Sequence, residues 1–62
     1  MSVKRIDIVK HFEDNGYYFQ REGGNHTIFS NGTKKIPIKR HRVIDRTSAN
    51  NLCKQAGIPP KF

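Results

Sequence analysis

The first fourteen residues carry apolar side chains at the spacing of an α-helix. An apolar residue recurs at every third position, at Val3, Ile6, Val9 and Phe12. This period places them along one side of a helix. Ser2 is a residue type that caps helix N-termini, and Gly16 is a frequent helix end because glycine adopts the left-handed conformation. The pattern therefore predicts a helix over about residues 3–14.

From Tyr17 the pattern changes to short runs of aromatic and β-branched residues, which are typical of strands. The runs cover residues 17–21, 26–29 and 34–38. Gly23-Gly24 separates the first two, and Asn31-Gly32, a strong hairpin signal, separates the last two. Pro37 has no N–H for a ladder, so the third strand is predicted at a sheet edge or strand end.

A second helical pattern follows a charged connection over residues 39–46. Its apolar positions are Ala49, Leu52, Cys53 and Ala56. Thr47 or Ser48 is predicted to cap this helix, and Gly57 is predicted to end it. Two prolines shortly beyond prevent the helix from resuming, so residues 57–62 are predicted to form a loose tail.

The order of elements predicts an α+β fold in a single domain spanning residues 1–62. Two amphipathic helices can cover only one face of a three-stranded antiparallel sheet, which leaves the other face open. Side chains alternate across a strand, so His26 and Phe29 point to opposite faces. Phe29 is the larger apolar side chain and is predicted in the core. His26 is then predicted on the open face, unless a bulge reverses the alternation.

The net charge of +7 is concentrated in one part of the chain. The first 22 residues balance four basic with four acidic groups, so the whole excess falls in residues 23–62. This distribution favours a polyanionic partner, because each neutralised phosphate releases counterions. Charge that serves solubility alone and an acidic protein partner are the alternatives. The predicted RNA contacts are Arg21, Lys34, Lys35, Lys39, Arg40, His41 and Arg42.

Several classes of protein are disfavoured by composition. The single cysteine, Cys53, excludes an internal disulfide and is expected to be buried in the second helix. No apolar run exceeds three residues, so neither a signal peptide nor a membrane span is predicted, and a cytoplasmic location is expected. The three histidines are too far apart for common ligand spacings. We therefore expect no metal and no cofactor.

His26 is the histidine with the most suggestive setting. Gly23, Gly24 and Asn25 form a turn before it, where glycine allows the backbone to approach a substrate closely. Arg21 precedes the turn and offers a positive charge to a phosphate. An imidazole exchanges protons near neutral pH, so His26 is a candidate base for a ribose 2′-hydroxyl. The alternative is a turn residue without a role. His11 is expected to be solvated on the first helix, and His41 to add to the basic patch.

Together, these motifs resemble the HicA (YcfA-like) toxin family of toxin–antitoxin systems, from about Lys4 to Ile58. The matching pieces are Gly16-Tyr17, Arg21, Gly24-Asn25-His26, Ile28-Phe29, Ile36-Pro37 and residues 52–58. The resemblance implies a fold like that of double-stranded-RNA-binding domains and an endoribonuclease that cleaves mRNA, with His26 as the catalytic residue. It also implies inhibition by a HicB-type antitoxin. The toxin alone is expected to be monomeric and the complex oligomeric.

The chain departs from the family pattern at four positions. Asn25 replaces a usual serine, Thr47 a common glycine and Cys53 a usual leucine. Lys39 stands where many members have a second histidine, which leaves the proton donor for the leaving 5′-oxygen unassigned. His41 is a candidate for that donor only if its loop brings it near His26, and water would otherwise serve.

Two other functions fit the same residues. A non-catalytic RNA-binding module of the same fold would use the basic patch, with Tyr17, Tyr18 and Phe29 as a stacking surface. A purely protein-binding chain would present the patch to an acidic partner.

Overall fold

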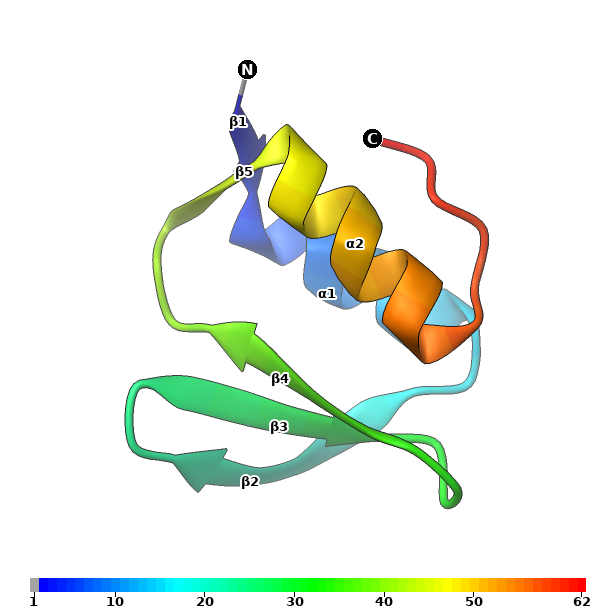
Figure 1. The fold of residues 1–62 in the computed structure, drawn as a ribbon. Coiled ribbons are helices and arrows are strands. Elements are labelled where there is room, and N and C mark those ends of the chain that lie inside the picture. The colour runs from blue at the N-terminus through cyan, green and yellow to red at the C-terminus, as the bar shows by residue number, and fades with distance from the viewer. Residues whose placement is uncertain (1) are drawn as a thin grey trace.

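The computed structural model describes residues 2–62 and arranges them in two layers (Figure 1). The elements in chain order are β1 (Ser2–Lys4), α1 (Arg5–Asp14), β2 (Tyr18–Gly23), β3 (His26–Ser30), β4 (Lys35–Lys39), β5 (Val43–Asp45) and α2 (Arg46–Ala56). Strands β2, β3 and β4 form an antiparallel sheet, and both helices lie on the same side of it. The predicted α+β fold is confirmed. No helix within residues 2–62 is long and apolar enough to cross a membrane.

A second sheet, of two strands, was not predicted. β1 pairs with β5 in antiparallel fashion, with Val3 opposite Ile44. The prediction of a helix that starts at residue 3 and is capped by Ser2 is therefore wrong. α1 begins at Arg5, and Lys4 occupies the N-cap without a side-chain hydrogen bond. In this pairing, backbone N–H and C=O groups of β5 form hydrogen bonds with β1, which they could not do if residues 43–45 were part of an irregular connection.

The buried side of α1 is rotated relative to the prediction. Its buried residues are Ile8, His11 and Phe12. Ile6, which the pattern assigns to the apolar side, is 72% exposed. His11 was expected in solvent, but its Nε2 donates to the carbonyl oxygen of Pro59 at 2.7 Å and its ring packs edge-on against Phe62. These contacts hold the C-terminal segment on α1, in place of the predicted loose tail.

α2 follows the predicted pattern, except at its first residue. The N-cap is Asp45, whose carboxylate accepts a hydrogen bond from the backbone N–H of Ser48 at 3.2 Å. The predicted caps, Thr47 and Ser48, lie inside the helix instead. Gly57 ends α2 with a φ of +72°, as predicted. Of the predicted apolar positions, Ala49, Cys53 and Ala56 are buried and Leu52 is half-buried.

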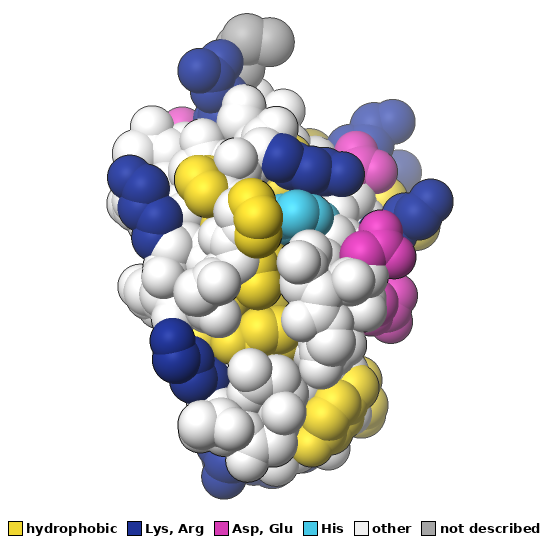
Figure 2. All heavy atoms as spheres, turned by 90° about the vertical axis from the view of Figure 1, so that its right-hand side faces the viewer, with side chains coloured by type: hydrophobic (Ala, Val, Ile, Leu, Met, Phe, Trp, Pro, Cys, Tyr) yellow, Lys and Arg dark blue, Asp and Glu magenta, His cyan; other side chains and the backbone are white. Residues whose placement is uncertain are grey.

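The core lies between the helices and the inner face of the sheet. Phe29 pairs with Ile36 across β3 and β4, and Thr27 pairs with Ile38, so these four residues share that face. All four are buried, and Phe29 packs edge-on against Phe12 of α1. Figure 2 shows one side of the molecule, where hydrophobic side chains form a strip between polar and charged ones.

Tyr17 joins the start of the sheet to the end of α2. Its side chain is buried, and its hydroxyl donates to the carbonyl oxygen of Ala56 at 2.8 Å. That carbonyl belongs to the last turn of the helix, where intrahelical partners are missing. Burial raises the pKa of the Tyr17 phenol above 10.0.

We predict that Tyr17→Phe lowers the free energy of unfolding by about 1–2 kcal/mol at pH 7, because the Ala56 carbonyl is left buried without its donor. Tyr18→Phe is the control, since Tyr18 is 51% exposed, and should change that free energy by less than about 0.5 kcal/mol. The measurement is urea unfolding followed by circular dichroism. Equal losses in the two variants would contradict a role for the Tyr17 hydroxyl.

The same pair of variants tests the raised pKa of Tyr17. The folded state keeps this proton to higher pH than the unfolded state, so stability from Tyr17 is lost as the pH rises above 10. The difference in unfolding free energy between wild type and Tyr17→Phe should therefore shrink above that pH. A difference that stays constant up to pH 11 would contradict the shift.

Candidate active site

His26 is held at the start of β3 by a two-residue turn. Gly24 has a φ of +63°, whereas Asn25 has a negative φ, and this combination matches a type II′ hairpin turn. A side chain at position 24 would be strained, which explains the glycine. The turn sets a register in which Gly23 pairs directly with His26.

Alternation along β3 places His26 on the face away from the core, as the size of Phe29 predicts. Thr27 and Phe29 are each only 3% exposed, whereas His26 is half-buried on the other face. The sheet does contain a bulge, between Phe19 and Arg21 of β2. It leaves the alternation of β3 intact.

The neighbours of His26 on its face come from both adjacent strands. Lys39 of β4 lies directly opposite His26, and such pairs have Cβ atoms about 4.5–5.5 Å apart. On the β2 side, Nη1 of Arg21 lies 3.6 Å from the position a Cβ would occupy on Gly23. Ile28 lies nearer to that position, at 3.4 Å, so Ile28 and Arg21 both lie over Gly23, the residue that pairs with His26. The sheet brings one imidazole and two cationic side chains to the same end.

His26 also lines a groove of about 320 Å³ between the sheet and α2. The other lining residues are Pro37, Lys39, Ile44, Ser48, Asn51, Leu52 and Gln55. β4 is an edge strand and contacts α2, so one side of the helix stands next to the end of the sheet. The groove therefore passes over the edge strand β4, from the sheet face that carries His26 to α2 on the other side of the sheet.

A polar network fixes the strands on either side of His26. Arg5 of α1 donates from Nη2 to Oγ1 of Thr27 at 2.7 Å and from Nε to the carbonyl oxygen of Lys39 at 3.1 Å. The Thr27 hydroxyl donates to Glu22 at 3.1 Å, and Glu22 forms an ion pair with Arg40 at 3.1 Å. The sequence does not indicate this role of Arg5, because Thr27 lies 22 positions away.

The seven predicted RNA contacts are all exposed, although Arg40 is engaged in the ion pair with Glu22, and they do not form one patch. Lys34 and Lys35 lie at the far end of the sheet, where Lys35 pairs with Ser30. Arg21 and Lys39 lie near His26, as described above. His41 lines a separate hollow with Asn25 and Arg40, next to the turn but outside the groove of His26. Arg42 directly precedes β5 and lines another hollow, which does not include His26.

The predicted aromatic stacking surface is mostly wrong. Tyr17 and Phe29 are each 3% exposed and belong to the core. Tyr18 is 51% exposed, and its neighbour Phe19 is 54% exposed. Only these two aromatic side chains of β2 are accessible for stacking.

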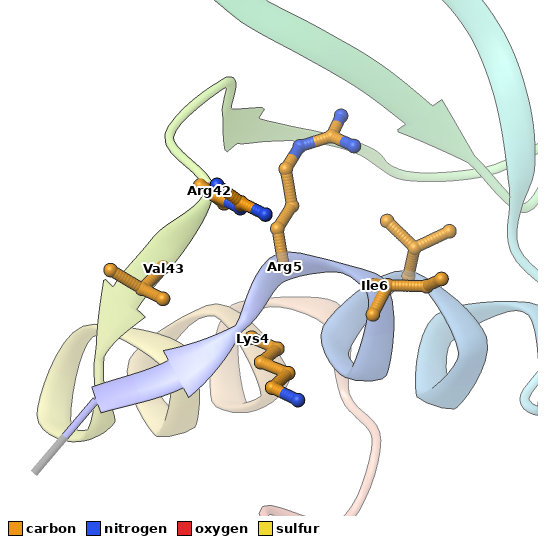
Figure 3. A pocket seen from close by; sticks show the side chains of 6 residues that line it. Lys4, Arg5, Ile6, Arg42 and Val43 are labelled. Carbon is orange, nitrogen blue, oxygen red and sulfur yellow. The ribbon is translucent and has the colours of Figure 1, made fainter.

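A larger hollow, of about 560 Å³, does not include His26 in its lining (Figure 3). Its lining residues are Lys4, Arg5, Ile6, Val9, Arg42 and Val43. In Figure 3 the Arg5 side chain extends toward the sheet, consistent with its hydrogen bonds to Thr27 and Lys39. None of the six side chains can accept a proton near neutral pH. The groove of His26 is therefore the better candidate for acid–base chemistry, despite its smaller volume.

Two further expectations concern metal binding and Cys53. Within residues 2–62, no group of three or more His, Cys, Asp or Glu side chains is placed to hold a metal ion. Cys53 is buried, as predicted, and desolvation raises the pKa of its thiol. A raised pKa disfavours the thiolate, so Cys53 is unsuited to act as a nucleophile.

Comparison with known proteins gives one match. The family model described as HicA toxin of bacterial toxin-antitoxin matches residues 6–58. The match runs from α1 to the second residue after the end of α2 and includes the turn that positions His26. No curated protein and no solved structure matches the chain. Because the family model covers most of the chain, the protein belongs to the HicA family and is a toxin of a bacterial toxin–antitoxin system.

Proposed function

We propose that this toxin is an endoribonuclease that cleaves mRNA, with His26 as the general base. One observation carries the proposal: His26 and Lys39 lie directly opposite each other and line the same groove. An imidazole can accept a proton, and an ammonium beside it can stabilise a phosphate that gains charge. Family membership and the exposed cations at this end of the sheet support the same substrate.

The proposed reaction uses the nucleophile that RNA carries. His26 takes the proton of a ribose 2′-hydroxyl, and the 2′-oxygen bonds to the adjacent phosphorus as the bond to the 5′-oxygen breaks. The products are a 2′,3′-cyclic phosphate and a new 5′-hydroxyl end. Lys39 stabilises the non-bridging oxygens, and Arg21 neutralises phosphate charge on the β2 side. Because His41 lines a different hollow, the leaving oxygen takes its proton from water. This scheme requires no metal ion.

The family also implies an antitoxin partner. We propose that a HicB-type antitoxin inhibits the toxin by covering the groove of His26. The groove is accessible from solvent, so the surface of another protein can cover it. The mRNA and the antitoxin would then compete for this groove in the cytoplasm. The toxin alone would act as a monomer, because His26, Lys39 and Arg21 all come from one chain.

We predict that His26→Ala lowers the rate of RNA cleavage by ~10²–10⁴-fold, the usual contribution of a general base, and leaves RNA affinity nearly unchanged. The measurement is gel analysis of single-stranded RNA in EDTA, with circular dichroism to show that the variant is folded. His41→Ala is the matched control and should retain most of the activity. A substrate with 2′-deoxyribose throughout should bind and remain intact.

Three results would contradict this assignment. Cleavage by both wild type and His26→Ala would point to another base or a contaminant. Loss of cleavage in His41→Ala but not in His26→Ala would show that His41, and not His26, is the general base. If the folded wild type binds RNA and cuts none, the chain is a non-catalytic RNA-binding module.

Lys39 and Lys35 allow a second test within one strand. Both are exposed on the same face of β4, but Lys39 pairs with His26 and Lys35 pairs with Ser30. We predict that Lys39→Gln lowers kcat by ~10²-fold, as for removal of other groups that stabilise transition-state charge. Lys35→Gln should leave kcat unchanged and at most weaken binding at higher salt. Equal effects of the two substitutions on kcat would show that Lys39 contributes only to the overall positive charge of the surface and has no specific role beside His26.

A further inference from the structure

One wall of the His26 groove is uncharged and belongs to α2. Its lining residues are Ser48, Asn51, Leu52 and Gln55, which recur at the spacing of one side of a helix. From the first to the last they extend about 10 Å along the helix axis. The cations of α2, Arg46 and Lys54, are not among the residues that line the groove. This wall is therefore poorly suited to bind phosphate.

The wall presents two carboxamides that have no partner within the protein. Asn51 and Gln55 are exposed, and their side chains take part in none of the hydrogen bonds found within residues 2–62. The adjacent Asn50 differs, because its Oδ1 accepts from the backbone N–H of Phe62 at 3.0 Å. Asn31 likewise accepts two backbone hydrogen bonds in its turn. Asn51 and Gln55 thus keep their donors and acceptors available to a ligand.

The groove lined by these carboxamides and by His26 also has apolar lining residues. Pro37 of β4, Ile44 of β5 and Leu52 of α2 line the same groove as His26. A flat, largely apolar ring with hydrogen-bonding groups on its edge would satisfy both kinds of surface. Bases of single-stranded RNA have this form, and their edges are free of pairing partners.

We infer that the α2 wall binds the nucleobase next to the phosphate on which His26 acts, and that Asn51 and Gln55 determine which base is accepted. A carboxamide carries a donor and an acceptor side by side and can form two hydrogen bonds with one base edge. His26 and Lys39 on the opposite side of the groove receive the phosphate and ribose. This inference rests on the proposed ribonuclease function and adds a site for base selection to it.

The test uses oligonucleotides that are 2′-deoxy except at one ribonucleotide, so that only one bond can be cut. The bases on either side of that bond are varied among A, C, G and U, and kcat/KM is measured for each. The proteins are wild type, Asn51→Ala, Gln55→Ala and the double variant. Gln20→Ala is the matched control, because Gln20 is an exposed carboxamide on β2 outside the groove.

We expect wild type to prefer one base at one of these positions. The ratio of kcat/KM between the best and worst base should fall by about 5- to 150-fold in the double variant, the range expected for loss of a bidentate contact to a base. Cleavage of the worst substrate should persist, because His26 and Lys39 are unchanged. Gln20→Ala should keep the wild-type ratio. Thermal unfolding of each variant verifies the fold.

Other results overturn the inference. A wild-type ratio that survives in the double variant would show that α2 does not select the base. A weaker affinity for the antitoxin with an unchanged ratio would assign the wall to that protein. If wild type cuts no substrate, the ribonuclease function fails, and the site is then tested by fluorescence anisotropy with all-2′-deoxy oligonucleotides of the same sequences. Base-dependent affinity that the double variant loses would support the site, and its retention would overturn it.

Discussion

The hydrogen bonds of Arg5 are the interaction on which the candidate site depends. Arg5 is the first residue of α1. Its side chain donates hydrogen bonds to Thr27, the neighbour of His26, and to the carbonyl oxygen of Lys39. A guanidinium holds its donors in a rigid plane, so one residue can fix two strands relative to each other. The ends of strands otherwise open easily. Arg5, which belongs to the helix layer on the inner face of the sheet, thus fixes the position of the His26 imidazole relative to the Lys39 ammonium.

The parts of the fold that could be predicted depend on neighbours in sequence. Gly57 ends α2 because of its own backbone freedom, and the alternation of β3 buries Phe29 because adjacent residues point to opposite faces. The cap of α2 is a local error, because Asp45 takes the place of Thr47 or Ser48, but the larger errors involve distant partners. β1 is a strand only because β5 pairs with it, and His11 is buried because Pro59 offers a carbonyl at the far end of the chain. Spacing along α1 carries no information about that carbonyl.

The candidate site divides in the same way. His26 could be singled out from its sequence setting and from the resemblance to HicA toxins. The sequence pattern places Lys39 in the connection after the third strand, and its position opposite His26 depends on a hairpin loop longer than the two residues Asn31-Gly32. Asn51 and Gln55 could not be singled out, because carboxamides on the polar side of a helix are ordinarily solvated. Their relevance arises from the packing of α2 against β4, which places them in the groove of His26.

Packing on the inner side of α2 controls the groove on its outer side. The residues that turn inward are small, namely Ala49, Cys53 and Ala56, and they let the helix lie close to the sheet. Cys53 is fully buried, so a larger side chain at position 53 is expected to press on its neighbours and shift the helix. Such a shift would move Asn51 and Gln55 but not His26 and Lys39, which the sheet and Arg5 hold. The proposed base selection and the proposed bond cleavage would therefore depend on different parts of the core, so a change in packing is expected to alter the first without abolishing the second.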